Sequence, residues 1–270
     1  MGETIACANQ KGGVGKTTTV VNLGSYLALA GERVLIVDLD PQGNATSGLG
    51  LDRNSIERSV YDAVIDGTQI PELTVPGPVP GLDVVPSAIA LAGAEVELAP
   101  LEGRERRLAR LLSDVAAEYD YLLVDCPPSL GLLTVNALTA ADSVLIPLQC
   151  EYYALEGLTQ LLATLDLVRD HLNPLLVLKG VVLTMYDGRT NLSAAVAHEV
   201  RRHLGNRVFE TVVPRNVRLS EAPSHGMPIS AYAPESTGAA AYAALATELR
   251  RRDGRLPVAS GDIDEERVAS

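Results

Sequence analysis

A glycine-rich segment near the N-terminus carries the strongest chemical signal in the sequence. It reads Asn9-Gln-Lys-Gly-Gly-Val-Gly-Lys-Thr-Thr18, follows a strand-like run and opens a helix-like one. Glycines at this spacing let consecutive backbone N–H groups converge on phosphate oxygens at a helix N-terminus. Lys16 would then reach the β- and γ-phosphates of ATP, and the Thr17 hydroxyl would ligate Mg²⁺. The segment therefore predicts a phosphate loop that binds ATP and Mg²⁺.

A second lysine distinguishes this loop from the common pattern. Only three of the 22 basic residues are lysines, and two of them, Lys11 and Lys16, lie within six residues of each other. A compact ammonium suits sites where a planar guanidinium does not serve. The usual pattern has a glycine where Gln10 stands, and here Lys11 follows directly. Taken alone, without the surrounding motif, Lys11 is better explained as an exposed loop cation.

Three aspartates follow apolar strand-like runs. Asp38 and Asp40 come after Val34-Leu-Ile-Val37, and Asp125 comes after Tyr121-Leu-Leu-Val124. Ligands bind at the carboxyl edge of open α/β sheets, so these carboxylates are expected near the phosphate loop. A carboxylate there holds Mg²⁺ through water or orients the attacking water. For Asp38, a role in satisfying nearby backbone donors is an equal alternative.

Together these stretches resemble the deviant Walker A ATPases of the ParA/Soj chromosome-partitioning type, relatives of MinD. The matching segments cover residues 3 to about 250, and their joint occurrence is far more specific than any one of them. They are Asn9–Thr18, Val37–Asn44, Leu123–Pro128, Glu151–Gly157 and Pro214–Pro223.

The resemblance implies roles at the nucleotide. Lys11 crosses a homodimer interface to the phosphates of ATP held by the other subunit, Asp40 is the hydrolytic residue, and Asp125 is the Walker B carboxylate. Lys11, Lys16 and Asp40 are thus the expected catalytic residues, and Thr17 the metal ligand. The expected ATP-binding residues are Lys11, Gly12, Gly13, Val14, Gly15, Lys16, Thr17, Thr18, Asp125, Pro214 and Asn216, the last two beside the adenine.

The resemblance also implies partners. Arg189 and Arg218 match the arginines with which the family contacts double-stranded DNA without reading sequence, and a ParB-type centromere-binding protein is the expected stimulator of hydrolysis. Residues 169–225 carry a net charge of +3, while the rest of this −12 chain carries −15, so a basic face is compatible with an acidic protein. A cytoplasmic protein associated with the nucleoid is expected.

The remaining sequence must position these groups. Apolar β-branched runs alternate with helical patterns, and strands apolar at every position indicate burial on both faces of a parallel sheet. We predict a three-layer, doubly wound α/β domain over residues 1–252, a surface loop over Ile70–Gly81 and a flexible acidic tail over 253–270. Strands are expected at Thr4–Ala8, Arg33–Val37, Leu82–Val85, Tyr121–Val124, Ser143–Pro147, Leu178–Leu183 and Glu210–Val213, and helices at Thr17–Ala30, Ser55–Ile65, Arg104–Glu118, Leu133–Ala140, Leu155–Asp170, Leu192–Leu204 and Thr237–Arg252.

Composition limits the alternatives. Three scattered cysteines without a CxxC pair disfavour disulfides, zinc and an iron–sulfur cluster. No apolar run is long enough to span a bilayer, and the acidic C-terminus differs from the basic membrane-binding helix of MinD relatives. Two rivals remain for testing: a metabolic phosphate-loop synthetase and a membrane-positioning ATPase.

Overall fold

The computed structural model describes residues 2–53, 55–151 and 154–256. Eight strands form one sheet in the order β3-β4-β2-β5-β1-β6-β7-β8. All neighbouring strands pair in parallel except β3 and β4, which are antiparallel. The strands are β1 (Glu3–Cys7), β2 (Val34–Asp38), β3 (Val75–Pro76), β4 (Leu82–Val85), β5 (Tyr121–Asp125), β6 (Ser143–Gln149), β7 (Val177–Tyr186) and β8 (Val208–Pro214).

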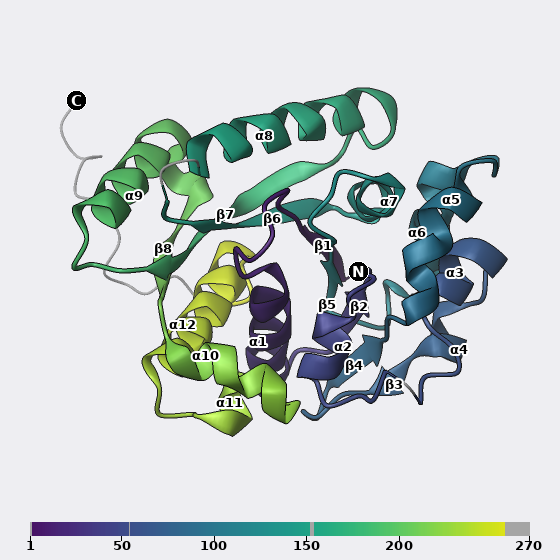
Figure 1. Ribbon diagram of the computed structural model, residues 1–270, viewed down its shortest axis with the longest axis horizontal. Coiled ribbons are helices and arrows are strands. Elements are labelled where there is room, and N and C mark those ends of the chain that lie inside the picture. Colours follow the sequence, from purple (N-terminus) through teal and green to yellow (C-terminus); the bar gives the residue numbers. More distant parts are fainter. Residues whose placement is uncertain (1, 54, 152–153, 257–270) are drawn as a thin grey trace.

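Helices cover both faces of the sheet, which confirms the predicted three-layer α/β fold (Figure 1). One face packs against α1 (Lys16–Leu29), α2 (Asn44–Gly48), α10 (Val217–Glu221), α11 (Ile229–Tyr232) and α12 (Thr237–Arg252). The other packs against α3 (Val60–Asp66), α4 (Ile70–Leu73), α5 (Ala94–Leu98), α6 (Arg107–Val115), α7 (Leu132–Ala140), α8 (Ala154–His171) and α9 (Asn191–Leu204).

The apolar character of the strands follows from this double burial. In β2, Val34 and Ile36 belong to the core under α1, while Leu35 and Val37 belong to the core on the opposite face. Each residue of such a strand loses its contact with water whichever way it points, so alternation of polar and apolar residues is absent. The seven predicted strands are present, with no end shifted by more than three residues.

The segment Ile70–Gly81 is not the predicted loop. It contains the short helix α4 and the two-residue edge strand β3, and the side chains of Ile70 and Leu73 are buried in the core. Pro71 lies in the first turn of α4, where a missing N–H costs no helical hydrogen bond, and Pro76 lies in the outermost strand of the sheet. Prolines at these tolerated positions made a folded segment resemble a loop.

The predicted helix Ser55–Ile65 begins later, at Val60. Ser59 is its N-cap and forms a capping box with Asp62, which satisfies backbone donors at the first turn and fixes the start of α3. The short helices α2, α5, α10 and α11 were not predicted, because one or two turns carry too little periodicity to detect.

The folded domain extends past the predicted boundary at residue 252. Tyr121 donates a hydrogen bond to Asp253 at 2.8 Å, Lys179 forms an ion pair with the same carboxylate, and Arg255 pairs with Glu32 at 2.6 Å. Asp253 and Arg255 therefore belong to the domain rather than to a free tail. The part of the predicted tail from residue 257 onward lies outside the described residues.

Candidate functional site

A cavity of about 410 Å³ opens at the carboxyl edge of the sheet, where the phosphate loop leaves β1. It gathers residues from the loop and α1, from the segment after β2, from the segment after β5, from the end of β7 and from the segment after α10. Its lining includes Gly12, Gly13, Gly15, Lys16, Thr17, Thr18, Asp40, Gln42, Asn44, Pro128, Met185, Pro223 and Met227. The cavity thus joins the predicted phosphate loop to Asp40.

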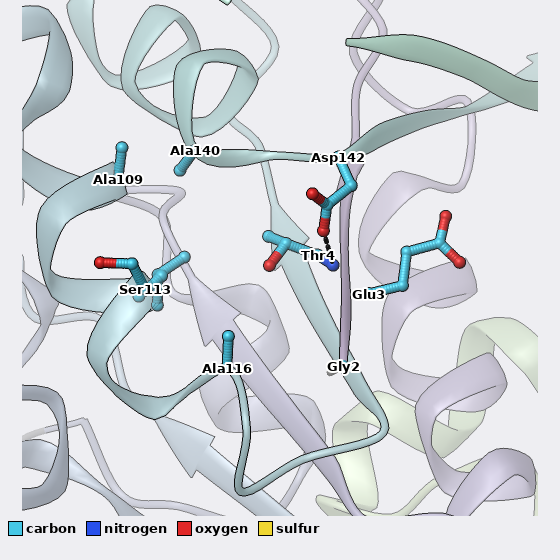
Figure 2. Close-up of a pocket in the computed structure, with 9 residues that line it drawn as sticks. Gly2, Glu3, Thr4, Ala109, Ser113, Ala116, Ala140 and Asp142 are labelled. Carbon is cyan, nitrogen blue, oxygen red and sulfur yellow. Dashed lines mark hydrogen bonds between the residues drawn. The ribbon is translucent and has the colours of Figure 1, made fainter. Parts of the chain in front are cut away.

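A second cavity, of about 380 Å³, lies at the opposite edge of the sheet and has a different chemistry (Figure 2). Its lining consists mainly of small residues, with two carboxylates, Glu3 and Asp142, and no basic side chain. The Asp142 carboxylate accepts a hydrogen bond from the Thr4 N–H at 2.8 Å, so it serves the start of β1. A cavity with acidic and without basic groups does not suit a polyphosphate.

The phosphate loop has the backbone geometry of an anion cradle. Gly13 and Gly15 adopt positive φ angles of 74° and 90°, which side chains disfavour. Gly15 is the N-cap of α1 and supplies no side-chain cap, so N–H groups of the first turn remain available to a ligand. The Thr184 hydroxyl donates to the Val14 carbonyl at 2.8 Å and ties the loop to β7.

Lys16 brings a positive charge into this cradle. Its side chain is buried, with the residue only 6% exposed, and Nζ donates to the Lys11 carbonyl at 3.2 Å. Among the described residues no carboxylate lies within ion-pair distance of it. A buried ammonium without an anionic partner is costly, which points to an anionic ligand at this position.

Thr17 and Asp125 offer a fit for a divalent cation beside the phosphates. Thr17 Oγ1 donates to Asp125 Oδ2 at 2.7 Å, while Asp125 Oδ1 is one of three buried side-chain atoms in the described part of the chain that lack a hydrogen-bond partner. Burial, and after it the nearby Asp38 carboxylate, raises the pKa of Asp125 well above its usual value. An orphaned carboxylate oxygen next to a hydroxyl suits Mg²⁺ and its coordinated water.

The two aspartates after β2 differ in their contacts. Asp38 is fully buried and accepts hydrogen bonds from Thr46 N at 2.7 Å, Thr46 Oγ1 at 2.6 Å and Asp40 N at 3.3 Å. Burial raises the pKa of Asp38 to about 6, although the Thr46 bonds oppose the shift. Of the two roles that the sequence left open, these contacts favour the structural one, because Asp38 holds the segment that carries Asp40.

Asp40 faces the cavity. Its Oδ1 accepts a hydrogen bond from Gln42 N at 2.9 Å, and its carbonyl accepts one from the Ser87 hydroxyl at 2.8 Å. No hydrogen bond reaches Asp40 Oδ2 from the described residues, so this oxygen is available to a water molecule in the cavity.

Lys11 lies at the rim of the site. Its ammonium forms an ion pair with Glu151 of the same chain at 2.6 Å, and the two side chains are 46% and 47% exposed. In a single chain Lys11 therefore makes a local contact, and its expected contact with phosphates would need a second subunit.

A neighbouring cavity of about 310 Å³ contains the predicted adenine residues Pro214 and Asn216. It shares Gly15, Thr18, Met185 and Pro223 with the phosphate cavity, so the two spaces adjoin. Asn216 caps α10 through Arg218 N at 2.8 Å and donates to Thr237 Oγ1 at 2.7 Å. An amide has two donors and two acceptor positions, so one of each remains for a base edge.

Met185 is a site residue that sequence reasoning missed. It lines both cavities, and its φ angle of 49° is the one positive value among the described non-glycine residues. Strained backbone of this kind gathers at ligand sites. The available signal was its position at the end of β7, on the same sheet edge as Asp40 and Asp125.

The two predicted DNA-contacting arginines lie on exposed segments after neighbouring strands, Arg189 after β7 and Arg218 in α10 after β8. Arg189 is 88% exposed and forms an ion pair with Asp187 at 2.7 Å. Arg218 is 58% exposed and forms one with Glu221 at 2.8 Å. Both arginines are accessible to a partner, and both are already matched by a carboxylate.

Comparison with known proteins agrees with this architecture. A family model described as an AAA domain matches residues 2–178. The chain is 59% identical over 249 residues to the sporulation initiation inhibitor protein Soj of Bacillus subtilis, covering 92% of this chain and 98% of that protein. It is 56% identical over 253 residues to the chromosome partitioning protein ParA of Myxococcus xanthus, covering 94% and 89%.

A solved structure shares the fold of this chain. A protein described as cobyrinic acid a,c-diamide synthase from Mycobacterium smegmatis, with bound ADP and magnesium, superposes with a TM-score of 0.82 and 39% identity, covering 95% of this chain and 97% of that one. The length and level of these matches, together with the sheet order and the phosphate loop, lead to one assignment. The chain belongs to the ParA/Soj family of chromosome-partitioning ATPases.

Proposed function

We propose that this protein is a nucleotide switch: it binds ATP with Mg²⁺, pairs with a second copy, binds duplex DNA without sequence preference, and separates after hydrolysis. The observation that carries the proposal is the convergence on one cavity of the phosphate loop, Lys16 with no carboxylate in ion-pair distance among the described residues, Thr17 and Asp40. Asp125 lies behind this lining, hydrogen-bonded to Thr17.

The chain's own groups divide the chemistry among them. The loop N–H groups and Lys16 bind the phosphates, and Asp40 orients a water by accepting a hydrogen bond from it. Thr17 and the phosphates would hold Mg²⁺, with Asp125 acting through coordinated water, and the ion would supply charge stabilisation. The water oxygen bonds to the γ-phosphorus as the bond to the β,γ-bridging oxygen breaks, giving ADP and phosphate.

Lys11 couples this chemistry to pairing. One loop and Mg²⁺ leave part of the triphosphate charge uncompensated, and an ammonium from a second chain would complete it. Exposure of Lys11 at the rim of the site supports this role, because the side chain is accessible to another molecule once it leaves Glu151. Loss of the γ-phosphate on hydrolysis removes part of the attraction, and the pair separates.

Lys11→Ala should bind ATP with near-normal affinity and remain monomeric, because only the charge supplied to the other subunit is removed. Sedimentation velocity with ATP and Mg²⁺ measures the monomer–dimer equilibrium, and fluorescence titration with a labelled ATP measures binding. Arg58→Ala is the matched control, since Arg58 is also an exposed cation paired with a carboxylate, Glu72 at 3.0 Å. ATP-dependent dimers of Lys11→Ala would contradict the assignment.

Duplex DNA is the proposed binding partner of the dimer, and a ParB-type protein is the proposed stimulator of ATP hydrolysis. Arg189 and Arg218 from both subunits would contact phosphates, which gives binding without base readout and with steep salt dependence. Two copies of a weak patch on one dimer act together through effective concentration, so nucleotide state controls affinity. In cells such a protein would associate with the nucleoid.

The decisive experiment measures binding to duplex DNA with ADP and with ATP, at two salt concentrations, for the wild type and for Arg218→Glu. Binding should require ATP, weaken with salt and fall strongly in the variant, because a cation at the phosphates becomes an anion. Binding that is indifferent to both nucleotide and mutation would remove the partitioning mechanism from consideration.

A small-molecule synthase is the second candidate, because one structural neighbour carries that description. The identity to that protein is 39%, against 59% and 56% for the two partitioning proteins, so the partitioning function is favoured. ATP turnover stimulated by a small carboxylic acid, and not by DNA, would support the synthase. Among the described residues no helix is long and apolar enough to cross a membrane; vesicle sedimentation with ATP tests the membrane-positioning alternative.

A further inference from the structure

The two arginines assigned to DNA contribute no net charge to the surface of a single chain, because each is matched by a carboxylate. Asp187 accepts Arg189 Nε at 2.8 Å and Nη2 at 2.7 Å, a two-point contact between the guanidinium and both carboxylate oxygens. Glu221 Oε2 accepts Arg218 Nη1 at 2.8 Å. These four side chains sum to a charge of zero where a phosphate-binding surface would need an excess of cations.

Both carboxylates are held in place by further contacts. Asp187 also accepts the backbone N–H of Arg189 at 3.1 Å, and Glu221 also accepts the Tyr232 hydroxyl at 3.1 Å from α11. The Arg189 guanidinium lowers the pKa of Asp187 to about 2, and the Arg218 guanidinium lowers the pKa of Glu221. Both groups are therefore anionic at neutral pH and positioned against their arginines.

We propose that Asp187 and Glu221 act as competitors of DNA phosphates for Arg189 and Arg218, keeping the single chain off DNA so that stable binding needs two chains. This inference rests on the proposed DNA function and names its regulation. A phosphate must displace each carboxylate, and each displacement lowers the affinity of one patch.

The size of the effect follows from the exposure of the pairs. Exposed ion pairs are weak, so each carboxylate should lower DNA affinity by about threefold, and the two in one chain by about tenfold. In a dimer that binds through two copies of the patch the factors multiply, to roughly a hundredfold, as for any bivalent ligand. Arg215, which follows β8 and makes no ion pair within the described residues, remains as a cation for the first encounter.

The test compares the wild type with Asp187→Asn, Glu221→Gln and the double variant, each loaded with ADP and with a non-hydrolysable ATP analogue, in a duplex-DNA titration. The double variant should bind about tenfold more tightly with ADP and about a hundredfold more tightly with the analogue. Tyr232→Phe, which removes one hydrogen bond that holds Glu221, should shift affinity in the same direction by less.

Two controls separate competition from a general loss of negative charge. Glu235→Gln removes an exposed carboxylate close to α11 that has no ion-pair partner in the described part of the chain. Glu72→Gln, on α4, releases Arg58 at the other end of the molecule from α10 (Figure 1). Both should leave DNA affinity nearly unchanged, and thermal melting should show that all variants are folded.

The outcomes distinguish this inference from the proposed function. If the wild type with ATP does not bind DNA at all, the proposed function itself fails. If the wild type binds and Arg218→Glu abolishes binding, but Asp187→Asn and Glu221→Gln change affinity no more than Glu235→Gln does, competition by these carboxylates is overturned while the function stands. The link to pairing predicts that the fold-increase in DNA affinity of the dimer is the square of that of the monomer. Equal fold-increases in DNA affinity for the two would overturn this link.

Discussion

Lys16→Ala should lose nucleotide binding. Removing one partner of a buried charge pair costs about 2–5 kcal/mol, so affinity for ATP should fall roughly 30- to 5000-fold. The structure supports the upper part of this range, because the Lys16 ammonium is buried at the phosphate loop and no described carboxylate lies within ion-pair distance of it. A titration with fluorescent ATP, followed by competition with unlabelled ATP, gives the ratio directly.

The same variant should fold at least as well as the wild type without ligand. A buried ammonium with one carbonyl partner destabilises the free protein, so its removal should leave the ligand-free melting temperature unchanged or raise it. ATP should then raise the melting temperature of the wild type and not that of Lys16→Ala, since binding stabilises only a protein that binds. Lys11→Ala is the matched control, an ammonium five residues away that should keep the ATP-induced shift. A normal shift in Lys16→Ala would refute its role.

The parts of this site that sequence predicts are those set by local spacing. The phosphate loop follows a strand and opens a helix, and three aspartates end or closely follow buried strands, so topology alone brings them to one edge of the sheet. Asp38 and Asp40 show the limit of this reasoning. The same position at a strand end fits either role, and only the contacts with Thr46 and Gln42 separate a structural carboxylate from one that faces the cavity.

Contacts between segments far apart in the chain could not be predicted from the sequence. Lys11 and Glu151 are 140 residues apart, and nothing in either motif indicates that they pair in one chain. Likewise, the Lys179–Asp253 pair extends the folded domain through residues that composition alone marks as tail. Met185 was missed because a strained backbone conformation cannot be recognised from the residue type. A methionine at the end of a strand is normally interpreted as a core residue.

The pairs at Arg189 and Arg218 are a different case. Their carboxylates lie two and three residues away in the sequence and could have been noticed there. A charge count over the segment adds these anions to the cations but cannot tell which neutralise each other. The geometry shows that the two arginines expected at DNA are among those matched by a carboxylate, whereas Arg207 and Arg215 make no ion pair within the described residues. The net charge of this segment therefore does not tell which of its arginines are free of a carboxylate partner and available to DNA.

Asp40→Ala should separate binding from hydrolysis. Its carboxylate contributes one hydrogen bond to the protein, from Gln42 N, and has one oxygen free toward the cavity, so its loss should leave the phosphate loop intact. A positioned proton acceptor is worth about 10²- to 10⁴-fold in rate, and ATP turnover should fall by that factor with affinity nearly unchanged. Phosphate release under saturating ATP, with DNA present, is the measurement.

The effect on assembly is the stronger test, because this inactivating substitution should increase the amount of DNA-bound dimer, whereas inactivating substitutions usually reduce binding. With hydrolysis blocked, the γ-phosphate persists, Lys11 keeps its proposed contact in the second subunit, and the dimer should accumulate on DNA instead of disappearing from it. Asp40→Asn, which keeps the shape and the acceptor for Gln42 N, should give the same trapped dimer if the lost function is water activation. A variant that turns over ATP normally would show that another group orients the water. A slow variant that stays monomeric would show that Asp40 acts on pairing, and would break the proposed order of pairing before hydrolysis.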